Sequence, residues 1–337
     1  MREGTGHVRD VTCHQVGEQR LAEALDDIHG RAYARWHSLR YDSASPARIR
    51  AMADELLDHV AARAIAEPGL DDKARAVAVT AAECVHGVLS VMCFPDGDQK
   101  IRFPLVGEVI STDPDDDEFG DGPITFRDVV REAPTARTWL DMFEVCVVSG
   151  HVWDWERVTG LLLRGDYAPA IRDGVPYNSY TSVSAPADLA AVDALCLYLT
   201  EAAGHLPRDW PTVPLRKPDA DERAEAARRL DELGDALSAD QRLLRVLLDD
   251  DQDAFEEALV ARLVAYRESV EADAGDPAPR SLLPLGALTL ACLAVQVHGW
   301  ELGVRSGYLP YGLLGSTDAL RRAAEGNRNT LGLWAAK

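Results

Sequence analysis

The stretch that decides the fold is SPARIRAMADELLDHVAARAIA, residues Ser45–Ala66. Its apolar side chains recur every three or four residues, which places them on one face of a helix. Ser45 followed by Pro46 favours a helix start, because serine caps free backbone N–H groups and proline tolerates the first helical position. We therefore expect a helix over Pro46–Ala66, with an apolar face formed by Ile49, Met52, Leu56, Leu57, Val60 and Ala64.

Most of the remaining chain shows the same helical periodicity. Asp71–Phe94 is rich in Ala and Val, and we expect it to form a helix at the centre of the core. An earlier helix is expected over Glu18–Ser38. Capping-box patterns at Thr125–Asp128 and Ser238–Gln241 indicate two further helix starts. The other helices are expected over 137–149, 155–163, 188–203, 219–234, 254–269 and 281–297, with a short one near the C-terminus.

One segment departs from the helical pattern. Gln99–Ser111, QKIRFPLVGEVIS, predicts a short β-hairpin or an extended arm. Thr112–Pro123 follows and predicts a solvated loop, because it combines Pro and Gly with five Asp residues. The patterns together predict a mostly all-α fold, a multi-helix array of about ten helices with one β excursion near 99–111.

The chain is expected to form a single helical domain over 1–337. Leu206–Pro218 carries four prolines and is the candidate internal linker. A division there would give helical parts over 1–205 and 219–337. We find no repeat of fixed period, so the sequence does not predict a regular solenoid.

Acidic residues dominate the charge of this 337-residue chain. Asp and Glu number 56 against 35 Lys and Arg, which gives a net charge of −21. This charge repels phosphate backbones and anionic membrane surfaces, so we expect no direct binding to nucleic acid or membrane. It would instead attract a basic protein partner.

Cysteine usage and hydropathy indicate a reducing, cytoplasmic environment. Six cysteines in a chain of this length are too few for a disulfide scaffold. The N-terminal residues lack the apolar stretch of a signal peptide. The longest apolar run, Leu282–Val297, is shorter than a bilayer requires and is interrupted by Pro284 and Gly286. We therefore expect a soluble protein.

Signatures of catalysis are mostly absent from the sequence. There is no phosphate-binding loop and no Gly-x-Gly-x-x-Gly after a predicted strand. Ser306 lies between Gly303 and Gly307, but this spacing differs from that of a nucleophile elbow. Trp153-Asp154-Trp155 could form an exposed aromatic patch, although core packing is the favoured interpretation. We expect no cofactor.

Two spacings raise the alternative of a metal site. Glu83 and His86 form a Glu-x-x-His pair on a predicted helix, as in di-iron helical bundles. Asp26 and His29 show a similar spacing. A di-metal bundle normally needs two Glu-x-x-His motifs and two further Glu, so exposed ion pairs and a packed histidine are favoured over a metal centre.

Three segments together resemble the immunity protein 49 family of bacterial polymorphic toxin systems. They are SLLPLGALTLACLAVQVHGWELGVRSGYLPYGLL (Ser281–Leu314), DDDQDAFEEALVARLVAYRES (Asp249–Ser269) and TWLDMFEVCVVSGHVWDWERVTGLL (Thr138–Leu162). The resemblance implies a non-enzymatic, mostly α protein that binds and blocks a toxin made by the same cell. It transfers no catalytic residue. Four residues of the first segment match the C-terminal motif of the family, and we interpret them as a turn that positions the last helix. These residues are Ser306, Tyr308, Leu309 and Pro310.

The function expected from the resemblance and the charge is neutralisation of a cognate toxin by occlusion of its active surface. Many toxins of this kind are basic nucleases, and an acidic surface complements such a partner. The candidate partner-binding residues lie in the acidic loop and are Asp113, Asp115, Asp116, Asp117 and Glu118. Two alternatives stay open: a di-metal carboxylate oxidase built on Glu83, His86, Asp26 and His29, and a general α-helical peptide-binding scaffold.

Overall fold

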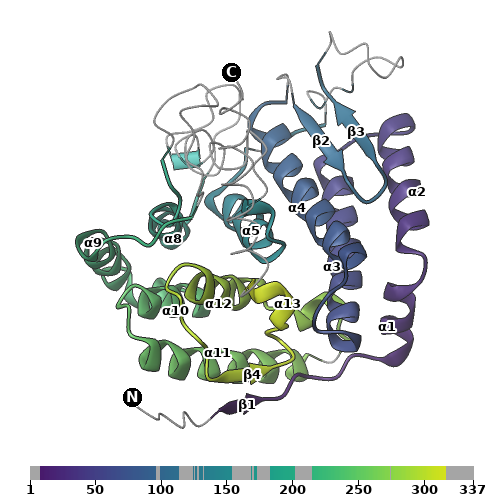
Figure 1. Ribbon diagram of the computed structural model, residues 1–337. Helices are drawn as coiled ribbons and strands as arrows, with labels where there is room; N and C mark the ends of the chain where they lie inside the picture. The colour runs from purple at the N-terminus through teal and green to yellow at the C-terminus, as the bar shows by residue number, and fades with distance from the viewer. Residues whose placement is uncertain are drawn as a thin grey trace, which may run out of the picture.

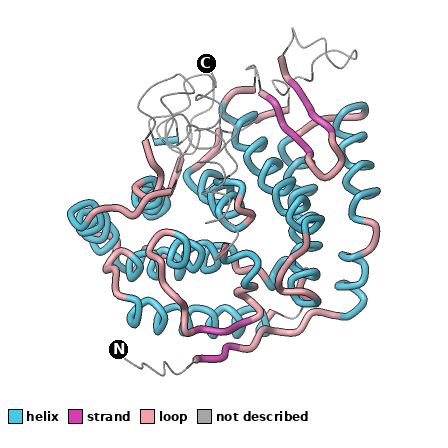
Figure 2. The backbone as a smooth tube through the Cα atoms, in the orientation of Figure 1, coloured by secondary structure: helices cyan, strands magenta, loops and turns pink. Residues whose placement is uncertain are grey.

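The computed structural model confirms a mostly α multi-helix array with a few short strands (Figures 1 and 2). It describes residues 8–95, 99–113, 124, 126, 129–131, 133–153, 168, 171–172, 183–201, 215–273 and 275–315. The N-terminal helices are α1 (Glu18–Leu25), α2 (Ile28–Tyr41), α3 (Pro46–Ala66), α4 (Asp72–Cys93) and α5 (Ala136–Val148). The C-terminal helices are α8 (Pro186–Cys196), α9 (Ala220–Asp231), α10 (Ala239–Leu247), α11 (Gln252–Ala272), α12 (Leu285–Gln296) and α13 (Tyr311–Leu314).

Short 3-10 turns and strands complete the described elements. The 3-10 turns are η2 (His151–Trp153), η5 (Gly234–Ala236) and η6 (Pro279–Leu282). The strands are β1 (Arg9–Val11), β2 (Lys100–Phe103), β3 (Glu108–Ser111) and β4 (Val304–Ser306). Strands β2 and β3 pair antiparallel, which confirms the hairpin expected from the sequence.

Two groups of helices are joined through α5. Helices α3 and α4 lie side by side, with α1 and α2 along the outer side of α3. Helices α10, α11 and α12 pack on one another as the second group. Helix α5 contacts α4 of the first group and α12 of the second, and Figure 1 shows it between them.

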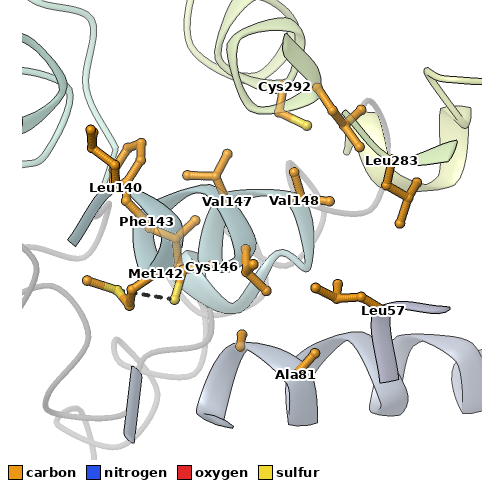
Figure 3. Close-up of a cluster of buried hydrophobic side chains, with 14 of the residues drawn as sticks. Leu57, Ala81, Leu140, Met142, Phe143, Cys146, Val147, Val148, Leu283 and Cys292 are labelled. Atoms are coloured by element: carbon orange, nitrogen blue, oxygen red, sulfur yellow. Dashed lines mark hydrogen bonds between the residues drawn. The ribbon is translucent and has the colours of Figure 1, made fainter. Parts of the chain in front are cut away.

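The core runs through this junction without a break. Figure 3 shows α5 side chains such as Phe143 and Val147 between Leu57 and Ala81 on one side and Cys292 on the other. Trp139 and Phe143 stack within α5 with ring centroids 5.1 Å apart. All six cysteines are free thiols, and only Cys13 is more than slightly exposed.

Helix α4 is the central helix that the sequence predicts. Nearly every residue from Ala81 to Cys93 is buried. Of the described helices, Asp72–Cys93 and the segment Pro279–Gln296 are long and apolar enough to cross a membrane by composition alone. Because 83% and 67% of their apolar windows are buried inside the fold, their apolar side chains serve the protein core.

The expected helix starts are largely confirmed. The Ser45 side chain accepts a hydrogen bond from the backbone N–H of Arg48 at 3.3 Å, which caps α3. Ser238 and Gln241 form the reciprocal capping box of α10. Thr125 and Asp128 of the expected capping box, the helix expected over 155–163, and most of the candidate linker 206–218 lie outside the described residues.

Three predicted helix boundaries were wrong. The expected helix Glu18–Ser38 is divided into α1 and α2, because the Asp27 side chain accepts a hydrogen bond from Gly30 N–H and caps a new helix instead of continuing the first. The expected helix 281–297 begins as η6, because Pro284 cannot donate within a helix and α12 starts after it. The expected helix 188–203 ends at Cys196, and Leu199 pairs with Leu215 instead.

The two ends of the described chain meet in a parallel pair that the sequence did not reveal. Strand β1 pairs with β4, with Arg9 opposite Val304 and Val11 opposite Ser306. In Figure 1 this pair lies beside α11. The pairing therefore brings the N-terminal strand against the C-terminal helix group.

Candidate functional site

A cleft of about 650 Å³ opens between the two helix groups. This volume falls within the range of about 300–1,000 Å³ that ligand sites occupy. Its lining comes from α3, α4, α5, α10 and α11, and its end comes from η6 and the start of α12. The lining residues with charged side chains are Arg50, Asp54, Arg137, Asp141, Glu144, Asp240, Arg262 and Arg280.

Helices α3 and α5 present the same pattern of residues to the cleft. Arg50 and Asp54 lie four positions apart on α3, and Arg137 and Asp141 lie four positions apart on α5. Residues with this spacing lie on one face of a helix, so each wall carries a guanidinium and a carboxylate one turn apart. The cleft is therefore lined by both signs of charge from α3 and from α5.

Ion pairs hold most of the arginines in place. Arg137 lies 2.8 Å from the Asp141 carboxylate and 2.6 Å from that of Glu144. Arg262 lies 2.7 Å from Asp240. These pairs neutralise much of the charge in the cleft, so its electrostatic character differs from that of the acidic chain as a whole.

Arg280 of η6 ties the end of the cleft to α3. Its backbone N–H donates to Asp58 at 2.8 Å, and its guanidinium lies 3.0 Å from the same carboxylate. The guanidinium also lies 3.6 Å from Asp54. Burial raises the pKa of Asp58, although these contacts with Arg280 oppose the rise.

Glu144 is the most deeply placed carboxylate of the cleft. Burial raises its pKa to about 7, against the opposing effect of the Arg137 guanidinium. Its backbone carbonyl accepts a hydrogen bond from the Thr289 hydroxyl at 3.1 Å, which fixes α12 to α5.

Gly286 allows the Asp240 carboxylate to lie against the start of α12. A Cβ atom at Gly286 would lie 2.6 Å from Asp240 Oδ2, so any larger residue would force the Asp240 side chain to shift. Asp240 is in turn held by Arg262, whose guanidinium lies 5.2 Å from the Tyr266 ring centroid. Glycine at this position thus preserves one wall of the cleft.

A hydrogen-bonded network lies directly behind the Ser281 end of the cleft. His14 Nε2 lies 2.8 Å from Ser281 Oγ, and His14 Nδ1 lies 2.7 Å from the Tyr308 hydroxyl. Ser281 Oγ donates to the Ala278 carbonyl at 2.7 Å, so His14 Nε2–H must donate to Ser281 and His14 Nδ1 must accept from Tyr308. Burial lowers the pKa of His14, which agrees with a neutral ring.

These proton positions give the network a structural role. A histidine that acts as a general base must accept the serine proton, whereas here it donates to the serine oxygen. The network instead joins the segment after β1, η6 and the turn after β4. The side chains of Ser281, His14 and Tyr308 therefore connect segments that are distant in the sequence.

The residues of the C-terminal family motif lie in β4 and the turn that leads to α13. Ser306 ends β4, and its carbonyl accepts from Leu309 N–H at 3.1 Å. Tyr308 is completely buried, and Pro310 precedes the first residue of α13. The family-motif interpretation as a turn before the last helix is compatible with this placement.

The predicted acidic contact residues are mostly beyond the described part of the chain. Asp113 is described, and its backbone N–H donates to the Ser111 hydroxyl at 3.2 Å. Asp115, Asp116, Asp117 and Glu118 lie outside the described residues. Their role in partner binding stays a prediction.

The residues of the metal alternative are not brought together. Asp26 and His29 are exposed near the break between α1 and α2, whereas Glu83 and His86 are buried within α4. Glu83 lies 3.4 Å from His151 rather than near either exposed residue. Within the described ranges no group of three or more His, Cys, Asp or Glu side chains is placed to hold a metal ion.

Trp153 is the described residue of the predicted aromatic patch, and it packs in the core. It is 7% exposed, and its indole N–H donates to Gln296 at 2.6 Å. Asp154 and Trp155 lie outside the described residues.

Sequence reasoning missed the charged cleft. Its nearest signal is the Arg-x-x-x-Asp spacing that occurs in both α3 and α5. That spacing also supports ordinary surface pairs, as with Arg245 of α10 and Asp249 just after it. Only the packing of the two helix groups shows that these particular residues face one space.

The fold is thus a mostly α array whose candidate site is a charged cleft between two helix groups. The family model for immunity protein 49 matches residues 67–313, and the chain belongs to this family. The match starts after α3, so α1, α2 and α3 precede it. Comparison with curated proteins and with solved structures gave no match.

Proposed function

We propose that this chain is an immunity protein that binds a cognate protein toxin and covers its active surface. The observation that carries the proposal is membership of the immunity protein 49 family over residues 67–313. Binding alone is sufficient for such a role, so the proposal needs no catalytic residue. We further propose that the protein acts in the cytoplasm of the cell that makes the toxin.

Charge supports a basic partner. The net charge of −21 creates a field that accelerates the approach of a positively charged protein. A basic nuclease is the toxin that this field favours. Salt screens such attraction, because the Debye length falls to about 8 Å at an ionic strength of 0.15 M. The association rate is therefore expected to fall as the salt concentration rises.

Co-expression tests the function directly. The chain is produced together with the toxin-domain protein encoded beside it, and growth is compared with that of cells that produce the toxin-domain protein alone. We expect rescue of growth and a stable complex in size-exclusion chromatography. Toxicity that persists in the absence of any complex would contradict the proposal.

Two further measurements test its finer parts. An association rate that does not change with salt would contradict electrostatic steering while leaving neutralisation intact. Binding to many unrelated peptides with similar affinity would favour a general peptide-binding scaffold instead of an immunity protein.

A further inference from the structure

The outer face of α2 carries a stripe of exposed aromatic rings. Helix α2 packs mainly on α3, and Figure 1 shows it at the outer edge of the first helix group. Positions four apart lie on neighbouring turns of one helix face. On the exposed face of α2 every fourth side chain is a ring, and we call these residues the α2 stripe: His29, Tyr33, His37 and Tyr41.

The rings of the α2 stripe are exposed and already packed on one another. Tyr33 and Tyr41 are 45% and 53% exposed. The ring centroids of His37 and Tyr41 lie 4.6 Å apart, and those of Tyr33 and His37 lie 6.4 Å apart. The buried Trp36 ring lies 5.4 Å from Tyr33 and 6.2 Å from Tyr41, measured between centroids. The rings are therefore held in place before a partner binds, which lowers the entropic cost of covering them.

A row of exposed rings is typical of a binding surface. Single exposed apolar residues are normal in a folded protein, whereas contiguous patches mark interaction sites. Tyrosine is enriched in interfaces, because it buries a large area and keeps a polar group at its tip. The family model matches residues 67–313, so the α2 stripe lies before the part of the chain that the match covers.

The charge of α2 differs from that of the acidic chain as a whole. Three arginines and no carboxylate lie within Ile28–Tyr41. Of the other described α-helices, only the buried α12 and the four-residue α13 also lack a carboxylate. Two copies that each carry a charge of −21 repel one another, and a contact without carboxylates keeps that repulsion small. The exposed face of α2 is therefore suited to contact between two copies of this chain.

Opposite charges flank the two ends of the α2 stripe. Arg31 and Arg35 are already paired with Glu55 of α3, at 2.7 and 3.1 Å. Arg40 has no ion-pair partner among the described residues, and the same holds for the exposed Asp26 before α2. One end of the stripe thus has a carboxylate available for pairing, and the other end has a guanidinium.

This order of charges and rings is self-complementary about Tyr33. Tyr33 lies midway in the sequence between Asp26 and Arg40, and also midway between His29 and His37. In a two-fold dimer, residues that face each other across the interface do so twice. Two antiparallel α2 helices with Tyr33 at the axis would place Arg40 of each copy opposite Asp26 of the other. Two parallel helices would instead place like charges opposite each other.

We propose that the α2 stripe is the contact between two copies of this chain, which pair through antiparallel α2 helices about Tyr33. The rings of the two stripes cover one another, and Asp26 of each copy pairs with Arg40 of the second copy. The dimer does not depend on the proposed function. Because the contact lies before residue 67, a dimer of immunity proteins would hold two toxin molecules.

Sedimentation velocity tests the dimer. We expect a monomer–dimer equilibrium with a dissociation constant of about 1–100 µM, because one pair of helices is at the small end of interface sizes. Tyr33→Ser should weaken the dimer at least about tenfold, the size of a binding hot spot. Tyr311→Ser removes an equally exposed tyrosine from α13 and should stay within about twofold.

Exchange of two charges tests the antiparallel arrangement. Arg40→Asp places two carboxylates at each end of the contact, and Asp26→Arg places two guanidinium groups there. Each single variant should weaken the dimer at least about fivefold, and the double variant Asp26→Arg/Arg40→Asp should return to within about threefold of the wild type. Lys73→Asp makes the same change of charge at an exposed position of α4 and is the control. Circular dichroism melting curves establish that each variant is folded.

The possible results separate this dimer from other roles of the α2 stripe. A wild-type chain that stays monomeric over the whole concentration range would contradict the proposal, as would a dimer that the α2 variants do not weaken. A double variant as weak as the single variants would contradict the antiparallel arrangement. Titration with an inactive variant of the toxin-domain protein is the last measurement. We expect Tyr33→Ser to bind it as the wild type does, whereas a loss of binding by a monomeric chain would assign the stripe to the toxin instead.

Discussion

His14 and Tyr308 are joined by two hydrogen bonds that connect opposite ends of the described chain. The Tyr308 hydroxyl accepts from the His14 backbone N–H at 3.0 Å and donates to the His14 ring at 2.7 Å. The two residues are 294 positions apart in the sequence. Together with the parallel pair β1–β4, this contact fixes the N-terminal strand against the turn before α13.

Removal of the Tyr308 hydroxyl is expected to destabilise the fold. Tyr308→Phe leaves the buried His14 N–H and ring nitrogen without their partner, which should cost about 1–3 kcal/mol in the free energy of unfolding. Tyr311→Phe is the matched control, because Tyr311 is 64% exposed and should change stability by less than about 0.5 kcal/mol. Urea denaturation of the two variants measures the difference, and equal stability would contradict the role of the hydroxyl.

A methyl group at Gly87 is expected to disturb the contact between α4 and β2. A Cβ atom there would lie 2.7 Å from Ile101 Cδ1 and 2.8 Å from Ile101 Cγ1. Gly87→Ala should therefore lower the free energy of unfolding by about 1–3 kcal/mol through overpacking, despite the better helix propensity of alanine. Gly275→Ala meets no atom within 4 Å and serves as the control. Thermal melting that ranks the two variants equally would show that α4 and β2 can separate without cost.

Glu83 is expected to make stability depend on pH. Burial raises the pKa of its carboxyl from 4.5 to about 7, although the positive charge and backbone N–H of Arg102 oppose the rise. The folded state therefore holds the proton more tightly than the unfolded chain does. The stability from this group is fully present below about pH 4.5 and is lost as the pH rises through about 7.

The variant Glu83→Gln tests whether stability falls with rising pH for this reason. The amide carries no charge, so the variant should lose less stability than the wild type between pH 4.5 and 7. This difference in the loss of stability is set by the pKa shift of Glu83, at about 1.4 kcal/mol for each pKa unit. Urea titrations at pH 5 and pH 8 measure it, with the exposed Glu257→Gln as the control. A difference between Glu83→Gln and the wild type that is the same at both pH values would contradict the prediction.

Local signals were sufficient to predict most elements of the fold. The Ser45 cap, the apolar stripe of α3 and the Ala- and Val-rich composition of α4 each arise from neighbours within a few residues. The hairpin β2–β3 is local in the same sense, because its strands are joined by a short turn. Physical preferences over such distances are readable from the sequence.

Signals that depend on distant contacts were not readable. Strand β1 has only three residues, and its partner β4 is near the other end of the described chain, so no periodicity indicates the pair. The sequence predicted one continuous helix over Glu18–Ser38, and the break at Asp27 appears only in the structure, where its side chain accepts from Gly30 N–H. The cleft likewise arises only when α5 packs against both helix groups.

The acidic stretch after β3 is expected to accelerate association with the toxin. Asp113, Asp115, Asp116, Asp117 and Glu118 combine like charges in a short segment, and their field would attract a basic surface at a distance. Replacement of these residues by Asn and Gln should slow association by up to about tenfold at low salt, with a smaller effect on dissociation.

A matched variant distinguishes this local effect from net charge. A second variant neutralises five other acidic residues, so it has the same net charge but keeps the stretch after β3 intact. The five positions lie in α11 or directly after it and are Asp253, Glu257, Glu268, Glu271 and Asp273. Stopped-flow mixing with the inactive toxin-domain protein measures both rates over a range of salt concentrations. Equal association rates for the two variants would show that the net charge of the chain accelerates association and would contradict a specific role of the acidic stretch.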